Sequence, residues 1–185
     1  MEIKKDVYKI SWDGNVYLIL KPVVMLIDTG RKSEREDIKE EIERIIPLNK
    51  IKIVLLTHLH YDHSGNIDLF ENAELYASKE EIEDFKKTPI FFGHLSSKKL
   101  KNKLKNFPKE IQGLEVIKVP GHTRGSVAFV DKRRKFLFSG DTLFDRAIGR
   151  TDLPNSVPSE MKNSLKKLND LIEKFDLKLC AGHDY

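Results

Sequence analysis

The sequence predicts an α/β protein that folds as a single domain over residues 1–185. Short apolar runs typical of strands alternate with segments whose apolar residues recur at helical spacing. The length is close to the usual size of one domain, and no Gly-, Ser- or Pro-rich linker interrupts the chain. Hydrophobic residues make up 39% and charged residues 34% of the sequence, which indicates a globular protein with a strongly ionic surface.

Three strands are expected before residue 30. Apolar runs over 7–10 and 15–20 predict two of them, and the Asp-Gly pair between the runs is a hairpin signal. The run over 23–27 predicts the third strand, which ends at Asp28.

A helix and a buried strand follow. Ser33 and Glu36 have the spacing of a capping box, and the helix after them presents one apolar stripe made of Ile38, Ile42, Ile45 and Ile46. Residues 47–50 interrupt this helix. The continuous apolar run over 51–56 then predicts a buried strand, whose end is a usual place for functional residues.

That strand leads into the segment 57–63, which holds three of the six histidines of the chain. His58 and His60 are two residues apart, so on extended backbone their imidazoles leave on the same side. Asp62 and His63 come where the chain turns, and they can point toward a second position beside the first. Imidazole and carboxylate ligands suit zinc, iron or manganese, so we predict a two-metal site rather than a chance cluster of solvated histidines.

The next elements are a short helix over 66–70, a strand over 74–77 and a helix that Ser78 caps and that runs to residue 87. Residues 88–110 break this alternation and are expected to form a lid-like basic insertion. Within it, apolar residues at helical spacing predict a short amphipathic helix with lysines around it: Leu100, Leu104, Phe107, Lys98, Lys99, Lys101, Lys103 and Lys105.

Two interpretations of this insertion stay open. It is either an ordinary surface helix with a solvated charged face, or a lid over the metals whose Lys98 and Lys99 bind substrate carboxylates. His94 also lies here and is expected to be structural or solvated.

The last third of the chain predicts three strands before a closing helix. A strand over 114–119 leads to His122, and a hairpin of strands over 127–130 and 135–138 leads to Asp141. The helix over 158–175 carries Met161, Leu165, Leu168 and Ile172 on one face. A strand over 177–180 then leads to His183.

The His-x-His-x-Asp-His segment, followed in order by Pro-Gly-His-Thr, Ser-Gly-Asp-Thr and Ala-Gly-His-Asp, resembles the metallo-β-lactamase-like hydrolases. The resemblance covers essentially the whole chain. It implies a four-layer αββα sandwich of two mixed β-sheets flanked by helices, with the site along one edge of the sheets. It also implies the ligands: His58, His60 and His122 for one metal, Asp62, His63 and His183 for the other, and Asp141 as the bridge.

Two further stretches refine this resemblance. Asp28 resembles an early signature of the family, where it would orient a metal-bound histidine; a plain turn aspartate is the alternative. Gly149 to Asp152 looks like the glyoxalase II and persulfide dioxygenase branch, which acts on glutathione thiol derivatives. Arg146 or Arg150 can bind a substrate carboxylate there, although an ion pair from Arg150 to Asp152 would equally explain that arginine.

The resemblance implies an enzyme that hydrolyses a small, anionic thioester, as hydroxyacylglutathione hydrolases do. Two divalent ions, zinc first with iron or manganese as alternatives, would generate hydroxide at neutral pH and polarise the carbonyl. Asp62 would orient the hydroxide, and Tyr185 could contact the substrate or supply a proton. Because the chain ends two residues after His183, we expect the C-terminal helical domain that binds glutathione in full-length glyoxalase II to be absent.

Two other functions are weighed against this one. The first is a mononuclear iron persulfide dioxygenase, in which His58, His122 and Asp141 form the facial triad of ligands. The second is a metal-dependent nuclease or RNA-binding protein. A net charge of +4, from 33 basic against 29 acidic residues, gives little support to nucleic acid as the partner.

Composition suggests a cytoplasmic location. The N-terminus lacks a signal-peptide pattern and no apolar run is long enough to span a membrane. The single cysteine, Cys180, excludes an intrachain disulfide; it is expected to be a buried residue near the end of a strand, with an approach to the site as the alternative. The scarcity of Gln and Cys beside many Lys and Glu hints at a thermophilic source. The oligomeric state stays open.

Overall fold

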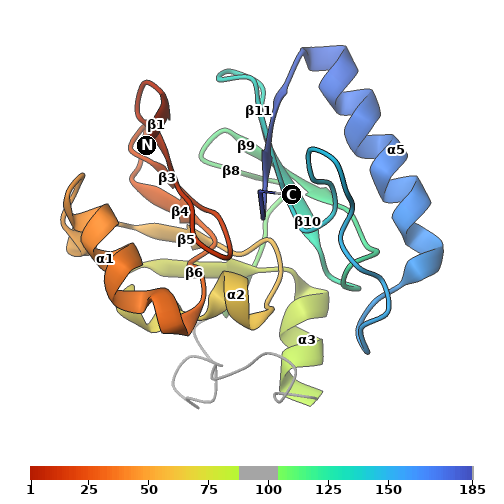
Figure 1. Ribbon diagram of the computed structural model, residues 1–185, viewed down its shortest axis with the longest axis horizontal. Coiled ribbons are helices and arrows are strands. Elements are labelled where there is room, and N and C mark those ends of the chain that lie inside the picture. The colour runs from red at the N-terminus through yellow and green to blue at the C-terminus, as the bar shows by residue number, and fades with distance from the viewer. Residues whose placement is uncertain (88–103, 185) are drawn as a thin grey trace.

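The computed structural model describes residues 1–87 and 104–184. Two mixed β-sheets pack face to face, with helices on both outer faces, which confirms the αββα sandwich (Figure 1). Within the described residues, no helix is both long enough and apolar enough to cross a membrane.

The first sheet has seven strands in sequence order. Neighbours are antiparallel from the first strand to the fourth and parallel from the fourth to the seventh. Its strands are β1 (Glu2–Lys4), β2 (Val7–Ile10), β3 (Val16–Ile19), β4 (Met25–Ile27), β5 (Ile53–Leu55), β6 (Glu74–Ala77) and β7 (Leu104–Asn106).

The second sheet has five strands. They lie in the order β12 (Lys178–Ala181), β11 (Phe136–Gly140), β10 (Val127–Asp131), β9 (Leu114–Lys118) and β8 (Glu110–Ile111). The pair β11 and β12 is parallel and the other pairs are antiparallel. Because β12 returns parallel to β11, the chain brings Asp141 and His183, which follow these two strands, to the same edge of the sandwich.

Helices cover the outer faces of both sheets. On the first sheet these are α1 (Arg35–Glu43), α2 (Tyr61–Ser64) and α3 (Lys79–Lys87), with short 3-10 turns at Lys32–Glu34, Leu48–Lys50 and Ile67–Leu69. On the second sheet α5 (Pro158–Phe175) packs Leu168 against the sheet. A separate apolar cluster, with Phe129 and Phe138 among its members, fills the space between the sheets.

Two expectations about helices are wrong. The first helix is not capped by Ser33: a 3-10 turn over Lys32–Glu34 precedes it, Glu34 occupies the N-cap, and this end makes no side-chain cap hydrogen bond. Ion pairs from Lys32 and Arg35 to Asp68, at 2.9 and 2.7 Å, hold the chain in that turn.

The amphipathic helix predicted around Leu104 and Phe107 is wrong for the part that is described. Leu104–Asn106 is a strand that extends the parallel edge of the first sheet beside β6. Phe107 packs on Phe129 between the sheets, with ring centroids 5.4 Å apart. The backbone N–H and C=O groups along the edge of β6 are available for hydrogen bonds, and this segment pairs with them as a strand. The helical spacing of its apolar residues gives no sign of that partner. Leu100, Lys98, Lys99, Lys101, Lys103 and His94 lie outside the described residues.

Candidate metal centre

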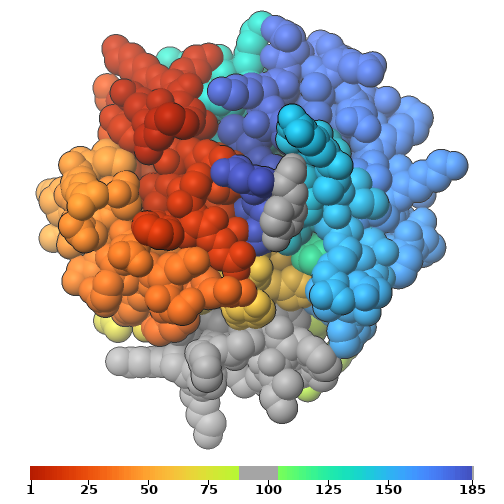
Figure 2. All heavy atoms as spheres, in the orientation of Figure 1, coloured from red at the N-terminus to blue at the C-terminus, as the bar shows by residue number. Residues whose placement is uncertain are grey.

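All seven predicted ligand side chains lie together at one edge of the sandwich. They come from the segments that follow β5, β9, β11 and β12, so residues far apart in the sequence become neighbours. On the face shown in Figure 2, the N-terminal part of the chain and the C-terminal part lie side by side, with the last of the described residues between them.

The first group of candidate ligands is His58, His60 and His122, whose donor atoms lie within 4.8 Å of one another. The Nε2 atom of His122 is 2.9 Å from Nδ1 of His60. On its other side, Nδ1 of His122 donates to the carbonyl oxygen of Arg150 at 2.8 Å. Because a carbonyl can only accept, this bond leaves the Nε2 lone pair of a neutral His122 facing inward.

The second group is Asp62, His63 and His183. The two Nε2 atoms of His63 and His183 are 3.3 Å apart, and Oδ2 of Asp62 is 3.6 Å from Nε2 of His183. The outer nitrogens of both rings are occupied: Nδ1 of His63 donates to Oδ2 of Asp28 at 2.9 Å, and Nδ1 of His183 donates to the carbonyl of Asp13. Both inner lone pairs of the neutral rings therefore face the same point.

Asp141 lies between the two groups. One carboxylate oxygen is 3.1 Å from Nε2 of His63, and the other is 3.3 Å from Nε2 of His183 and 3.5 Å from Nε2 of His122. The backbone at Gly182 passes close to this carboxylate: a Cβ at Gly182 would lie 2.3 Å from Oδ1 of Asp141. Glycine at 182 allows the chain after β12 to pass this close.

The donor set fits divalent metal ions. Nε2 of His58 and Oδ1 of Asp141 are buried and have no hydrogen-bond partner among residues 1–87 and 104–184. Beside them, the inward lone pairs of His63, His122 and His183 face carboxylate oxygens, so hydrogen-bond acceptors lie close together without a donor between them. A metal cation would satisfy such a set of acceptors. Mixed imidazole and carboxylate ligands suit zinc, iron and manganese.

The electrostatics of the two groups differ. Burial lowers the pKa of His58 and of His122, and it lowers the pKa of His60 to about 4, so these rings are neutral, the form that binds metal. For His63, burial works in the same direction, but the carboxylates of Asp141 and Asp28 outweigh it and raise the pKa. The negative potential of these two carboxylates would equally favour a metal cation beside His63.

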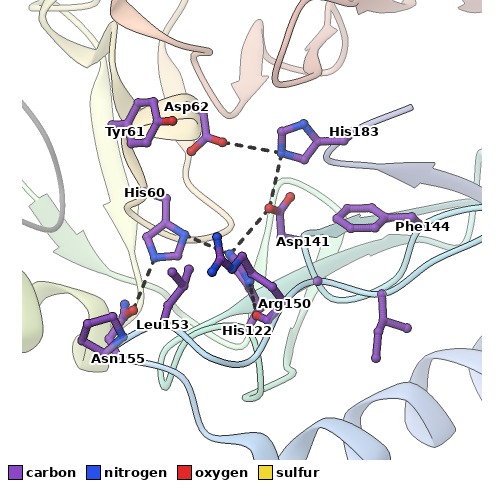
Figure 3. A pocket seen from close by; sticks show the side chains of 13 residues that line it. His60, Tyr61, Asp62, His122, Asp141, Phe144, Arg150, Leu153, Asn155 and His183 are labelled. Atoms are coloured by element: carbon purple, nitrogen blue, oxygen red, sulfur yellow. Dashed lines mark hydrogen bonds and ion pairs between the residues drawn. The ribbon is translucent and has the colours of Figure 1, made fainter. Parts of the chain in front are cut away.

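A pocket of about 380 Å³ opens onto both groups (Figure 3). His60, Asp62, His122, Asp141 and His183 form its polar floor. Its walls are largely apolar and come from Tyr61, Phe144, Ile148, Leu153 and Pro154, together with Gly149, Arg150 and Asn155. This combination of an apolar wall and a polar floor is typical of a small-molecule site.

Of the candidate substrate-binding residues, Arg150 lines the pocket at the candidate metal centre and Arg146 does not. Arg150 lines the pocket, but its guanidinium makes a double ion pair with Asp152 at 2.7 and 2.8 Å, the alternative weighed above. Arg146 lines a different pocket, beside Cys180 on the far side of His183. Cys180 itself is buried between the sheets, as the simpler interpretation expected. Tyr185, like Lys98 and Lys99, lies outside the described residues.

Three residues that contact the candidate ligands, or the loops that carry them, were missed at the level of sequence. Asn155 lies 3.4 Å from Nε2 of His60 through its Oδ1 atom, and the carbonyl of Asp13 holds His183. Nothing in the composition around these two residues distinguishes them from other loop positions. The third, Glu81, had a signal: Ser78 and Glu81 have the spacing of a capping box, and the backbone N–H of Glu81 donates to Ser78 Oγ at 3.1 Å. That pattern explains the backbone of Glu81 but not its buried carboxylate.

With this geometry, the chain belongs to the Metallo-beta-lactamase superfamily, whose profile matches residues 11–183. It is a metallo-hydrolase of this class.

Among its relatives is "Probable metallo-hydrolase MJ0888" of Methanocaldococcus jannaschii, 30% identical over 94% of this chain and 88% of the relative. The hydroxyacylglutathione hydrolase GloC of Haemophilus influenzae is 32% identical over 85% of this chain and 78% of its own length. The solved structure of TTHA1623 in a di-iron-bound form superposes with a TM-score of 0.74 at 27% identity, over 97% of this chain and 92% of that one.

Proposed function

We propose that this protein is a thioesterase with two divalent metal ions, acting on small acyl thioesters as glyoxalase II-like enzymes do. The observation that carries the proposal is that two three-residue donor groups lie side by side with Asp141 between them, and that two residues of each group line one pocket. A mononuclear iron dioxygenase needs one set of three ligands and makes no use of the Asp62, His63 and His183 group. The name of the Haemophilus influenzae relative supports a thioester as the substrate.

Metal ions bound by these groups would lower the pKa of a bound water to about 7 and polarise the thioester carbonyl. Zinc is our first choice, with iron or manganese as the alternatives.

Asp62 is placed to orient the attacking water. Its carboxylate lines the pocket floor and its side chain is 17% exposed, so a water in the pocket can donate a hydrogen bond to it. Asp141, more deeply buried, holds the two donor groups at a fixed separation. The leaving group places no further demand on the site, because a thiolate with a pKa of about 8.5 departs without first being protonated.

The pocket walls suit the acyl part of the substrate. Phe144, Ile148 and Leu153 offer apolar surface directly beside the polar floor, and Ile148 keeps 48% of its surface exposed. An anionic group on the substrate would compete with Asp152 for Arg150 at the rim. The volume of about 380 Å³ matches a small molecule better than a nucleic-acid strand.

The direct test is release of free thiol from a panel of acyl thioesters, followed with a colorimetric disulfide reagent. We expect turnover with zinc-loaded protein, loss of turnover after treatment with a chelator, and recovery when zinc is returned. Turnover that survives complete metal removal, or metal-loaded protein that cleaves no thioester in the panel, would contradict the proposal.

A further inference from the structure

Glu81 is a buried carboxylate at the start of α3, and the chemistry proposed above does not use it. Its side chain is fully buried, and its two oxygens accept hydrogen bonds from two different loops. Oε2 accepts from the backbone N–H of Leu59 at 2.8 Å, and Oε1 accepts from the backbone N–H of Gly125 at 3.2 Å.

These two loops carry one complete group of candidate ligands. Leu59 stands between His58 and His60, and Gly125 lies three residues after His122. Glu81 therefore connects the two segments that must hold His58, His60 and His122 at a common point, although it touches none of the three rings in the contacts described.

The packing around Gly125 shows how closely this connection is made. A Cβ at Gly125 would lie 2.5 Å from Ser78 Oγ, 2.6 Å from the backbone nitrogen of Glu81 and 2.7 Å from its Cγ. No larger residue fits there without moving the loop away from α3. The loop of His122 is thus seated directly on the start of the helix that carries Glu81.

The second group of ligands is held by other contacts. His63 is oriented by Asp28, and His183 by the carbonyl of Asp13. We infer that Glu81 is a positioning residue for the His58, His60 and His122 group, setting the affinity of that metal position independently of the other. The inference rests on the proposed metal centre but not on the identity of the substrate.

Glu81→Gln is the sharpest variant, because it keeps the size of the side chain. A carboxamide offers one acceptor oxygen and one NH₂ donor, so one of the two backbone N–H groups would face another donor. The link between the two loops is then broken with little change in packing.

Asp131→Asn is the matched control. Asp131 is a buried carboxylate, 1% exposed, that accepts from the backbone N–H of Arg134 at 2.8 Å and from its guanidinium at 2.7 Å. Asp131 stands at the end of β10 that is remote from the candidate ligands. At the opposite end of the strand, the backbone N–H of Val127 donates to the carbonyl oxygen of Thr57, next to His58. Loss of the Asp131 carboxylate lowers stability in a comparable way without reaching the metal centre.

The measurement is titration of metal-free protein with zinc against a competing chelator, and with cobalt followed by its visible spectrum. We expect one binding step of Glu81→Gln to weaken by about 10- to 100-fold, the usual cost of losing a group that orients ligands, while the other step is unchanged. Asp131→Asn should change neither step.

Unchanged zinc affinity in Glu81→Gln would overturn the inference, and so would equal weakening of both steps. A fall in melting temperature that matches Asp131→Asn with no change in binding would assign Glu81 a purely structural role and overturn it too. Wild-type protein that binds zinc in this titration but cleaves no thioester would count against the proposed function and leave the role of Glu81 standing.

Discussion

Oδ2 of Asp28 accepts a hydrogen bond from Nδ1 of His63 at 2.9 Å, and both side chains are buried. The same carboxylate accepts from the backbone N–H and the hydroxyl of Thr57, both at 2.8 Å. Asp28 therefore connects the end of β4 to the residue before His58 and to His63. This geometry favours the orienting role for Asp28 over that of an isolated turn residue.

Replacing Asp28 by Asn should weaken metal binding at the Asp62, His63 and His183 group by about 10- to 100-fold. The amide can still donate or accept one bond, but it no longer supplies the charge that fixes the tautomer of His63. Zinc affinity measured against a chelator tests this expectation. The idea would be wrong if the variant bound both ions as the wild type does.

Replacing Asp141 by Ala should remove at least one ion per chain and leave a soluble, folded protein. Loss of a residue that only orients a metal ligand usually lowers metal affinity or activity by about 10- to 100-fold. Loss of the carboxylate between both groups should therefore lower activity by more than about 100-fold. Elemental analysis and thiol release measure the two effects. Asp145→Ala, an exposed neighbour with 83% of its side chain accessible, is the control and should behave as wild type. Retention of both ions and of normal turnover in Asp141→Ala would contradict the bridging role.

Arg150→Ala should raise KM for thioesters that carry a carboxylate by about two- to fivefold, the size expected for an exposed ion pair, and should leave kcat unchanged. Arg146→Ala should have no such effect, because Arg146 lines a different pocket. Steady-state kinetics with a charged and a neutral thioester separates the two arginines. An equal rise in KM for both substrates would show that Arg150 does not recognise the charge.

Cys180 should be unreactive in the native protein. Burial disfavours the charged thiolate and raises the pKa of Cys180 to about 12, so at pH 8 roughly one molecule in ten thousand carries the thiolate. Alkylation should therefore be slow at neutral pH, increase only in strongly alkaline solution, and become fast on unfolding. Mass spectrometry after brief treatment with iodoacetamide checks this; rapid labelling of folded protein at pH 8 would place the thiol within reach of solvent.

The sequence was sufficient for much of the fold and for naming the candidate ligands that the fold brings together at one edge of the sandwich. Segments with strong periodicity, such as the helix over 158–175, appear with the expected bounds because one face of each is buried against a sheet. These candidate ligands could be named because histidines and aspartates at the ends of apolar runs follow a motif in a fixed order.

Contacts between segments distant in sequence could not be predicted. Leu104–Asn106 is a strand because β6 offers it an open edge, although its apolar spacing suggests a helix. Glu81 looks like an ordinary capping residue until the loops of Leu59 and Gly125 are placed beside it. In each case the deciding partner is supplied by the tertiary fold rather than by neighbouring sequence.

The most direct test of the account is metal content measured beside activity in one preparation, purified from medium that supplies zinc, iron and manganese in balance. We expect two metal ions per chain together with hydrolysis of acyl thioesters. One iron per chain with oxygen uptake on a persulfide, and no thioester hydrolysis, would contradict the two-metal thioesterase and establish a mononuclear dioxygenase in its place.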